Sequence, residues 1–357
     1  FTFCVFVVIF APNTTAMHFN ILKSNSLAID LGNNNTLVRD TQSLLVAQPS
    51  YIVFNADNTV KAVGDKAYDI FEKNHHALKP VKPLQGGVIA DYESARCMIK
   101  ALIKMAGVKQ SWFSRYDTII SGVPYATTQV ERKALGDSLE QFGARHTYLL
   151  FEPLAAALGM GLNIAQPDGK MLVDIGGGIT EIVVISLSGI AAFQSLKVAG
   201  DTFDQHIQDY FRKSFNMAIG IKTAEHIKMG VGATGIVAAQ QRKTMTVRGK
   251  DFVQGIPVSR TVCSEEIAEV LDRAITSIEQ AIVQTLETCP PELSADIYEN
   301  GMHLTGGNAM LPGLQQRFAQ HLHIPVHIDA QALQSVSKGI ARALQNPAQY
   351  KPVLLPQ

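Results

Sequence analysis

The chain has 357 residues, and its Lys plus Arg count equals its Asp plus Glu count at 31 each, so the formal net charge is zero. A protein whose main partner is nucleic acid normally carries a basic excess, and this balance argues against DNA or RNA as a partner. Hydrophobic residues make up 46% and charged residues 17%, an ordinary globular balance that excludes a disordered chain. The length of 357 residues is too great for one compact core and predicts two to three domains.

Cysteine usage indicates a reducing compartment. The cysteines are scattered, and no two of them lie at metal-ligand spacing. A disulfide framework is implausible in a long chain with few cysteines. We therefore expect a cytoplasmic protein.

Residues 1–25 form an N-terminal extension that begins with an apolar run, FTFCVFVVIFA. This run is shorter than the roughly 20 apolar residues of a bilayer-spanning helix, and it lacks the basic region of a secretory signal. Met17 is a candidate start of translation. Two interpretations stay open: residues 1–16 are translated upstream sequence, or they form a short segment that touches a membrane.

The first part of the chain alternates strands and helices. LAIDLG at 27–32 is an apolar run ending in Gly, and TLVRD at 36–40 follows a tight polar turn, which predicts a β-hairpin. A mixed stretch with several prolines, residues 48–91, predicts a small inserted lobe. A buried strand is expected at 117–124 and a helix at 130–144, which ends at a glycine suited to a C-cap.

The opening pattern repeats in the second half. KMLVDIGGGITEIVVISL at 170–187 is again a strand, a Gly-rich turn and a strand, and Asp174 precedes this turn as Asp30 precedes the first. The repetition predicts two structurally related halves. Residues 201–259 are more polar and predict a helical and irregular region.

The last third predicts further α/β layering. An amphipathic helix at 264–288 has Ser264 as its candidate cap. A strand, a Gly turn and a helix start follow at 301–314, and a closing helix covers 335–344.

Each of the two glycine turns can hold part of a metal-bound phosphate chain. Backbone N–H groups on one side of a tight Gly turn can cradle phosphate oxygens, and glycines let the backbone approach closely. A carboxylate at the strand end can hold hydrated Mg²⁺, which needs only one or two protein carboxylates. Because Asp30 and Asp174 supply this combination twice, a phosphate clamp is favoured over two ordinary hairpin turns.

Two other nucleotide-binding patterns are disfavoured. No segment of the sequence fits the P-loop pattern G-x-x-x-x-G-K-[ST]. A G-x-G-x-x-G does occur at 230–235, but it follows a helical stretch, whereas the dinucleotide fingerprint follows a strand. We interpret 230–235 as a loop.

Several segments, taken in chain order, resemble the MreB family of bacterial actins. IDLGNNNT (29–36) and VDIGGGITEIVVISLSGI (173–190) resemble its two phosphate loops, and FEPLAAALGMG (151–161) resembles its first connecting helix. The other segments in family order are VAGDTFD (198–204), KTAEHIK (222–228), CPPELSADI (289–297) and LTGGNAMLPGL (304–314). Each motif alone fits the wider actin, sugar-kinase and chaperone superfamily, and the resemblance covers roughly residues 26–345.

The resemblance implies an α/β, actin-like ATPase fold. Two related α/β halves would each have a mixed sheet and a smaller inserted subdomain, with the nucleotide in the cleft between the halves. The implied limits are 26–47 with 85–160 and 335–350 for subdomain IA, 48–84 for IB, 161–200 with 260–334 for IIA, and 201–259 for IIB.

The resemblance also implies roles for single residues around ATP or ADP and Mg²⁺. Asp30 and Asp174 would organise the metal ion. Glu152 would orient the hydrolytic water, and Thr180 would lie beside that water. The residues around the nucleotide would be Gly32, Asn33, Asn34, Asn35, Gly176, Gly177, Gly178, Gly200 and Asp201 at the phosphates, and Glu225, Lys228, Gly306, Gly307 and Asn308 at the ribose and base.

Glu152 has a physical rationale of its own. Phosphoryl transfer to water needs a group that orients the water. A carboxylate at a strand-to-helix junction, followed by Pro153 at the helix start, is rigidly held. The alternative is that Glu152 only complements the helix dipole.

Some positions depart from the family pattern. They are Asn33 in place of a hydroxyl residue, Phe151 and Gly230 each in place of an acid, Ile179 in place of Thr, and Asn308 in place of a third glycine. These departures leave ATP binding expected and the rate of hydrolysis open.

The function implied by the resemblance is that of a slow ATPase that polymerises head to tail into membrane-associated filaments and scaffolds cell-wall synthesis to set cell shape. Cell-wall elongation proteins would be its partners. At the inner face of the cytoplasmic membrane it would use a loop with Trp112 and Phe113, since aromatic residues favour the membrane interface. The alternatives are a small-molecule kinase of the same superfamily and a filament scaffold that does not hydrolyse ATP.

Overall fold

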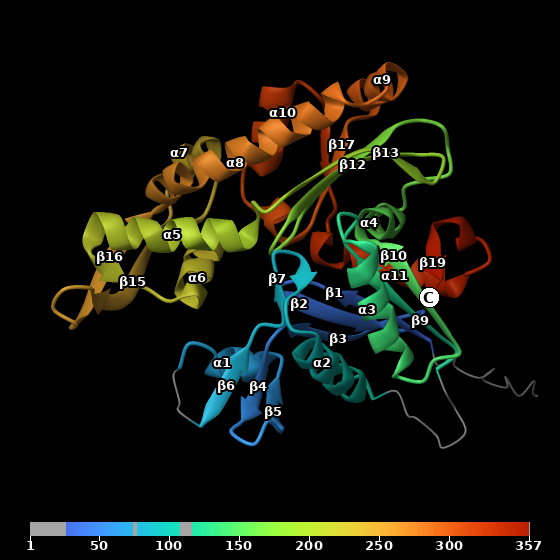
Figure 1. Ribbon diagram of the computed structural model, residues 1–357. Helices are drawn as coiled ribbons and strands as arrows, with labels where there is room; N and C mark the ends of the chain where they lie inside the picture. The colour runs from blue at the N-terminus through green and yellow to red at the C-terminus, as the bar shows by residue number, and fades with distance from the viewer. Residues whose placement is uncertain (1–25, 74–76, 108–115, 357) are drawn as a thin grey trace, which may run out of the picture.

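A computed structural model describes residues 26–73, 77–107 and 116–356, which form two α/β halves (Figure 1). The N-terminal extension at 1–25 and the predicted membrane residues Trp112 and Phe113 lie outside these described residues. Within the described ranges, none of the helices combines the length and the hydropathy needed to cross a membrane.

The first half is built on a six-stranded mixed sheet in the order β19-β10-β9-β1-β2-β3. Its strands are β1 (Leu27–Leu31), β2 (Asn35–Arg39), β3 (Leu44–Pro49), β9 (Thr118–Val123), β10 (His146–Phe151) and β19 (Leu354–Pro356). β1, β2 and β3 form an antiparallel meander, and β9 and β10 run parallel to β1 on its other side. The hairpin predicted at 27–40 and the strand predicted at 117–124 are confirmed.

The second half repeats this topology in a five-stranded sheet ordered β13-β12-β11-β17-β18. Its strands are β11 (Lys170–Ile175), β12 (Thr180–Ser186), β13 (Gly189–Leu196), β17 (Met302–Thr305) and β18 (Val326–Ile328). β11, β12 and β13 form the meander, and β17 and β18 are the two added parallel strands. The prediction of two related halves, made from the repeated Asp and Gly pattern, is confirmed by this match.

Helices cover both faces of each sheet, and two helices are shared between the sheets. The helices of the two main layers are α2 (Tyr92–Met105), α3 (Gln129–Glu140), α4 (Glu152–Met160), α8 (Ser264–Glu287), α9 (Pro291–Asn300), α10 (Leu314–Leu322) and α11 (Ser335–Gln345). α2 and α3 pack on the outer face of the first sheet, and α8 and α10 pack on the outer face of the second. α4 and α11 lie between the two sheets and form a third core with both of them.

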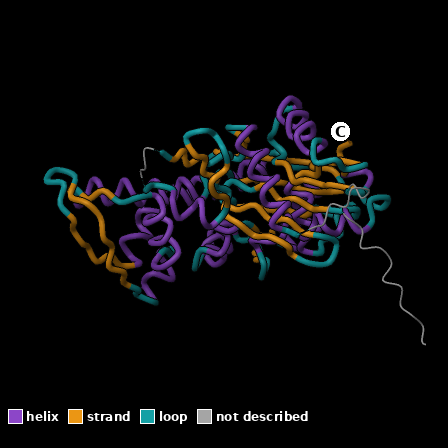
Figure 2. Tube along the Cα trace, turned by 90° about the horizontal axis from the view of Figure 1, so that it is seen from below, coloured by secondary structure: helices purple, strands orange, loops and turns teal. Residues whose placement is uncertain are grey.

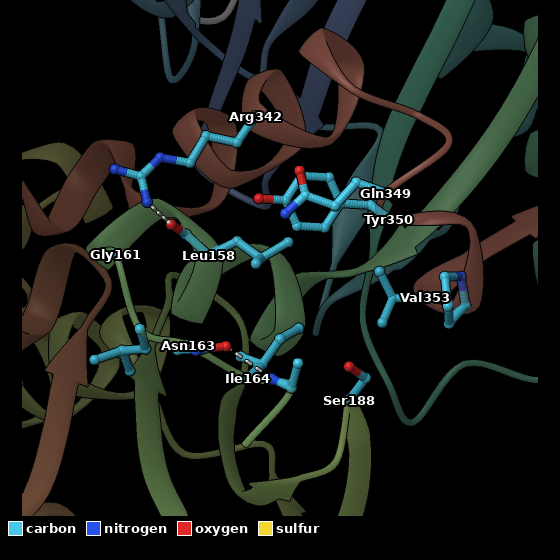
Figure 3. Close-up of a pocket in the computed structure, with 12 residues that line it drawn as sticks. Leu158, Gly161, Asn163, Ile164, Ser188, Arg342, Gln349, Tyr350 and Val353 are labelled. Atoms are coloured by element: carbon cyan, nitrogen blue, oxygen red, sulfur yellow. Dashed lines mark hydrogen bonds between the residues drawn. The ribbon is translucent and has the colours of Figure 1, made fainter.

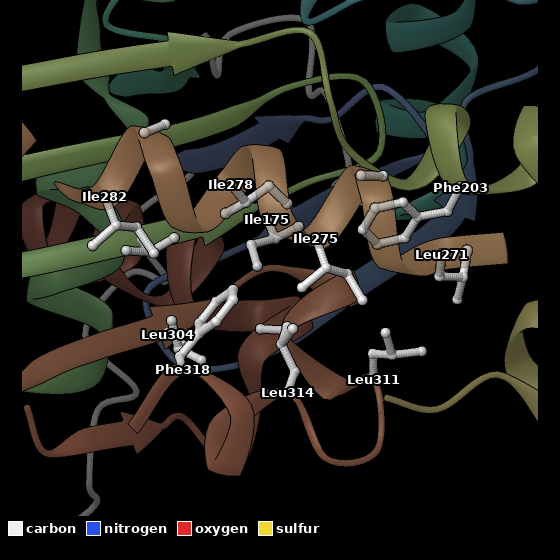
Figure 4. Close-up of a cluster of buried hydrophobic side chains, with 14 of the residues drawn as sticks. Ile175, Phe203, Leu271, Ile275, Ile278, Ile282, Leu304, Leu311, Leu314 and Phe318 are labelled. Carbon is white, nitrogen blue, oxygen red and sulfur yellow. The ribbon is translucent and has the colours of Figure 1, made fainter. Parts of the chain in front are cut away.

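The predicted amphipathic helix is α8, and its apolar stripe is the reason it packs as it does. Ile275, Ile278 and Ile282 recur at helical spacing and are fully buried with Phe318 and Leu304 (Figure 4). Each such side chain contributes about 1.5–3 kcal/mol when it leaves water. These contacts fix α8 and α10 against the second sheet.

The cap predicted for this helix was wrong by one residue. The N-cap is Cys263, whose N–H donates to the Glu266 carboxylate at 2.8 Å. Ser264 is already helical, and its hydroxyl oxygen accepts a bond from the Lys243 N–H at 3.1 Å. The acid at the third helical position therefore satisfies the backbone donor, which is half of a capping box.

α4 and α11 cross with their backbones in contact. A Cβ built on Gly339 would lie 1.6 Å from the Ala155 carbonyl oxygen, and one on Gly159 would lie 1.8 Å from the Ser335 carbonyl oxygen. Both distances are far inside van der Waals contact, so glycine is required at both positions. This crossing holds the first residue of α4, Glu152, at a fixed place between the sheets.

Each half carries a smaller lobe with its own sheet. The lobe of the first half has β4 (Ile52–Asn55), β5 (Val60–Val63), α1 (Asp65–Ile70) and β6 (Leu78–Val81), followed by the short pair β7 (Leu84–Gln85) and β8 (Val88–Ile89). The lobe of the second half has α5 (Gly200–Phe215), β14 (Met217–Ala218), α6 (Ile221–Val231), α7 (Gly235–Gln240), β15 (Thr244–Asp251) and β16 (Pro257–Cys263). The residue limits of the four subdomains stay a prediction.

The region predicted to be helical and irregular at 201–259 does contain the helices α5, α6 and α7. It also contains a regular antiparallel hairpin, β15–β16, which was not predicted and which projects from one end of the molecule (Figures 1 and 2). The sequence signal is weak because β15 has only two large apolar residues, Met245 and Val247, and Val247 alone is buried. The G-x-G-x-x-G segment at 230–235 contains the last two residues of α6, a loop at 232–234 and the first residue of α7, so it follows no strand, as expected, but only its middle is a loop.

We predict that Gly339→Ala lowers the free energy of unfolding by about 1–3 kcal/mol, because overpacking at the α4–α11 crossing forces the backbones apart. Urea denaturation followed by circular dichroism measures this change. Gly235→Ala is the matched control, since a Cβ at Gly235 meets nothing within 4 Å. Equal stability of Gly339→Ala and wild type would contradict the close crossing.

Candidate functional site

The alternation of side chains along the central strands directs Asp30 and Asp174 toward the same space. In β1, Ile29 packs on the α2 and α3 side, whereas Ala28 belongs to the core shared with α4 and α11. Asp30 is two residues after Ala28 and faces the same way, because strand side chains repeat every two residues. In β11, Leu172 belongs to the shared core, and Asp174 follows it by two residues. Both carboxylates therefore emerge beside the shared helices.

Four carboxyl groups gather where the two halves meet. Burial raises the pKa of Asp30 to about 7, and repulsion by Asp174 adds to this shift. Burial raises the pKa of Asp174 to about 6. Burial, and then repulsion by Asp30, Glu181 and Asp174, raises the pKa of Glu152 well above its ordinary value. The structure thus brings together Asp30, Asp174 and Glu152, as the sequence predicts.

The fourth carboxyl group, Glu181, is absent from the sequence-based site. Burial raises the pKa of Glu181 to about 8, with a further contribution from Asp174. The sequence offers one signal, a single charged residue within the apolar run of β12. That Glu181 lies directly across the ladder from Asp174 is known only from the strand register.

The carboxyl cluster fits a hydrated magnesium ion better than a metal held by protein alone. No three His, Cys, Asp or Glu side chains in the described ranges converge closely enough to hold a metal ion. Mg²⁺ keeps several waters and binds through one or two carboxylates and substrate phosphates. Asp30 is buried and Asp174 is partly buried, and the two carboxylates, which repel each other, supply that donor set.

The two predicted phosphate turns face each other at close range. A Cβ on Gly177 would lie 2.6 Å from the Asn34 side chain, and one on Gly178 would lie 2.7 Å from the Asn33 side-chain oxygen. These glycines allow the second turn to approach the first. Asn35, by contrast, is exposed at the start of β2.

Asn33 joins the first turn to the second half through a side-chain hydrogen bond. Its amide donates to Asp201 at 2.8 Å. Lys82, from the lobe of the first half, forms an ion pair with Asp201 at 3.0 Å and donates to Asn34 at 2.8 Å. The departure from a hydroxyl residue at position 33 therefore comes with a contact to α5.

The N-terminus of α5 is held beside the second turn. The N–H groups of Gly200 and Asp201 donate to the carbonyls of Gly176 and Gly177 at 3.1 and 2.7 Å. The Asn308 amide, in the 3₁₀ turn Gly307–Met310, also donates to the Gly176 carbonyl at 2.7 Å. The departure at position 308 thus adds a hydrogen bond to this turn.

Gly306 lies against the Asp174 carboxylate. Its φ is 85°, and a Cβ there would lie 2.4 Å from an Asp174 carboxylate oxygen. Both facts require glycine at this position. Gly307, the next residue, begins the 3₁₀ turn that carries Asn308.

Two predicted residues have contacts that their implied roles do not include. The Thr180 hydroxyl is buried and donates to the Val198 carbonyl at 2.7 Å. The Lys228 ammonium is buried in an ion pair with Asp204 at 2.9 Å and lies 3.3 Å from the Gly200 carbonyl oxygen. The role of Thr180 beside the hydrolytic water and the role of Lys228 at the ribose and base both stay predictions.

The two small lobes are joined across the cleft by what we call the Tyr68 latch, made of Tyr68, Glu72, Lys222 and Glu225. The Tyr68 hydroxyl donates to the Glu225 carboxylate at 2.7 Å. The Lys222 ammonium lies 4.0 Å from the centre of the Tyr68 ring and also donates to the Tyr68 carbonyl. Glu225, the predicted ribose contact, is therefore already held from the opposite lobe.

Glu72 completes the latch at the start of α6. Its carboxylate accepts bonds from the N–H groups of Ile221 at 2.6 Å and Lys222 at 3.4 Å. These are free donors at a helix N-terminus, where negative charge is favoured. Glu72 has a φ of 67°, a conformation that costs energy for a residue other than glycine. No local sequence signal identifies a pair such as Tyr68 and Glu225, which are 157 residues apart.

A separate cavity of about 340 Å³ lies at the opposite end of α4 from Glu152 (Figure 3). It is lined by residues of both halves, among them Leu158, Ile164, Ser188 and Tyr350. Arg342 donates to the Leu158 carbonyl in the last turn of α4, where a cation complements the helix dipole. The carboxyl cluster is therefore at one end of α4 and this cavity at the other.

Comparison with known proteins places these features in a family. The model of the MreB/Mbl protein family matches residues 24–352. The cell shape-determining protein MreB of Escherichia coli K12 is 37% identical over 333 residues, which are 92% of this chain and 95% of that protein. The cell shape-determining protein Mbl of Bacillus subtilis 168 is 38% identical over 325 residues, covering 90% and 96%.

Solved structures agree. MreB 5 of Spiroplasma citri bound to AMPPNP has a TM-score of 0.85 and 33% identity, covering 92% of this chain and 98% of that one. The same protein bound to ADP has a TM-score of 0.82 and 34% identity, covering 90% and 98%. A MamK double helical filament, at 19% identity, shares the fold with a TM-score of 0.76 over 90% of this chain and 99% of that one. The predicted actin-like ATPase fold is confirmed.

We predict that Tyr68→Phe accelerates nucleotide release about three- to tenfold, because it removes a hydrogen bond to a carboxylate that joins the lobes over the cleft. Stopped-flow displacement of a fluorescent ATP analogue measures the rate. Tyr298→Phe is the matched control, since Tyr298 is an exposed tyrosine of α9. An unchanged release rate in Tyr68→Phe would show that the latch does not restrain the nucleotide.

We also predict that the protein without metal and nucleotide loses stability between pH 6 and pH 8, a window set by the pKa values of Asp174, Asp30 and Glu181 at about 6, 7 and 8. The unfolded chain has released these protons by pH 6, while the folded chain still holds them, so rising pH favours unfolding. The loss in free energy of unfolding is on the order of 4 kcal/mol.

Urea denaturation in EDTA at the two pH values measures this loss, and Asp30→Asn is expected to reduce it. Asp117→Asn, which changes a half-exposed aspartate in an ion pair with Arg145, is the control. Stability that rises over this window would contradict the raised pKa values.

Proposed function

Since this chain belongs to the MreB/Mbl family of actin-like proteins, we propose that it binds ATP between its two halves, hydrolyses it slowly, and assembles into filaments that set cell shape. The observation that carries the proposal is the meeting of Asp30, Asp174 and Glu152 beside two facing glycine turns. The solved MreB 5 structures were bound to AMPPNP and ADP, and this supports a nucleotide at the same place.

In the proposed reaction Glu152 orients the attacking water. The water oxygen bonds to the γ-phosphorus while the bond from that phosphorus to the bridging oxygen breaks, giving ADP and inorganic phosphate, and the water protons leave with the products. Burial, followed by repulsion from the neighbouring carboxyl groups, raises the pKa of Glu152, and a carboxyl group held in this place can orient one water by a hydrogen bond. The fixed start of α4 between the sheets supplies the positioning that phosphoryl transfer needs.

The remaining residues bind and orient the triphosphate. Asp30 and Asp174 would hold Mg²⁺, which when bound neutralises phosphate charge. The turns at 32–35 and 177–178 would offer backbone N–H groups to the phosphates, as paired glycine turns can. The Gly176 N–H instead donates to the Ile179 carbonyl at 3.0 Å. The α5 N-terminus beside the second turn adds the positive end of a helix dipole.

Self-association, membrane contact and partners complete the proposal. We infer head-to-tail contacts that do not close, since such contacts give open filaments. We place the filaments at the inner face of the cytoplasmic membrane, with cell-wall elongation proteins as partners. The expected membrane residues Trp112 and Phe113 lie outside the described residues, and their role stays a prediction from the sequence.

We predict that Glu152→Ala lowers the rate of phosphate release about 100-fold, because the attacking water loses the group that orients it, while ATP-dependent sedimentation persists. Phosphate release and ultracentrifugal pelleting on the same samples test this. Glu93→Ala, an exposed glutamate of α2, is the control. Normal hydrolysis by Glu152→Ala would remove the catalytic assignment.

The same assay, repeated with a panel of sugars and with detection of sugar phosphates, separates the filament-forming ATPase from the kinase and from the non-hydrolysing scaffold. A phosphorylated sugar formed without sedimentable polymer would favour the kinase. Polymer formed by wild-type protein with ATP, and without phosphate release, would favour the non-hydrolysing scaffold.

A further inference from the structure

Glu181 marks a difference between two otherwise matching hairpins. In the first hairpin the ladder pairs Asp30 with Leu37, and in the second it pairs Asp174 with Glu181. The partner of the carboxylate is thus apolar in one half and acidic in the other. Leu37 demonstrates that this hairpin folds with an apolar residue at that place, so the fold alone does not require an acid.

The Glu181 carboxylate reaches into the other half of the molecule. Its Oε1 accepts hydrogen bonds from the N–H groups of Tyr125 at 2.8 Å and Ala126 at 3.3 Å. These residues lie in the turn 124–127, between β9 and α3 of the first half, and the Thr127 hydroxyl closes the turn by donating to the Pro124 carbonyl at 2.7 Å. Glu181 itself is 3% exposed. One oxygen atom of the second half therefore fixes a turn of the first.

The turn is also connected to the residue before Glu152. The Tyr125 ring lies edge-on between Phe151 and Phe193, with ring centres 4.7 Å apart in each pair. Phe151 is the last residue of β10 and the N-cap of α4, and Phe193 belongs to β13 of the second half. A shift of the turn would move Phe151 and, with it, the start of α4.

We propose that Glu181 is a positioning residue for ATP hydrolysis: it ties the turn 124–127 to β12 and so sets the position of Glu152 relative to Asp174. This inference rests on the proposed ATPase function. A buried carboxyl group is costly unless it is hydrogen-bonded, and the two bonds across the halves account for an acid here. Glu181 acts through Tyr125 and Phe151 and is not assigned a contact with the nucleotide.

Two substitutions separate this role from a general structural one. Glu181→Leu copies the residue of the first hairpin and removes both hydrogen bonds. Glu181→Gln keeps a side-chain oxygen that can accept both bonds, so it should retain the tie. Glu279→Gln is the matched control, because Glu279 is another buried glutamate of the second half, bonded to Arg317 at 2.7 Å away from this turn.

The experiment measures kcat and KM for ATP, thermal stability, and hydrogen exchange of the Tyr125 and Ala126 amides. Glu181→Leu is expected to lower kcat at least tenfold, with KM within threefold of wild type and with faster exchange of both amides. Glu181→Gln is expected to keep kcat within threefold and to keep both amides protected. Glu279→Gln is expected to lower the melting temperature and leave kcat unchanged.

Wild-type kcat in Glu181→Leu would overturn the inference, as would a tenfold loss in folded Glu181→Gln with its amides still protected. If Glu181→Leu does not fold, the test rests on Glu181→Gln alone, through its kcat and the hydrogen exchange of its Tyr125 and Ala126 amides. Failure of the wild-type protein to bind ATP or to release phosphate would instead refute the proposed function itself.

Discussion

The repulsion between carboxyl groups at the junction of the two halves is the constraint on which the rest of the structure depends. Asp30 and Asp174 come from different sheets, and burial would favour their separation or protonation. They stay together because α4 and α11 pack into both sheets at once and cross in contact. An apolar core therefore holds in place a polar site that a hydrated cation and phosphates would neutralise.

The contacts around this site form two layers with different strengths. Next to the carboxyl groups, the turns, the α5 N-terminus and Asn308 are joined mostly by backbone groups in rigid elements. Farther out, Tyr68, Glu72, Lys222 and Glu225 join the lobes through side chains, several of them partly exposed. Exposed polar contacts contribute little stability each. The backbone contacts beside the carboxyl groups are thus suited to holding a ligand in place. The side-chain contacts of the Tyr68 latch are weak enough to open when the ligand enters or leaves.

The sequence predicted what local patterns encode. The repeated Asp and Gly hairpins implied two halves, and period-two alternation explains why Asp30 and Asp174 meet. The long apolar stripe of α8 was equally plain, although its cap was misplaced by one residue because Glu266 serves the Cys263 N–H. Glu181 was overlooked, since only the strand register reveals that it pairs with Asp174. The Tyr68 latch has no local pattern, because it depends on how two lobes approach in space.

The crossing of α4 and α11 also mechanically couples the two ends of α4. Glu152 begins α4 and the cavity beside Arg342 lies at its other end, so the contact of Gly339 with Ala155 lies between the two spaces. A rotation of the two halves about this helix crossing would widen the space at the carboxyl cluster as it narrows the cavity beside Arg342, or the reverse. A molecule bound in the cavity beside Arg342 would then oppose movement at the Glu152 end of α4.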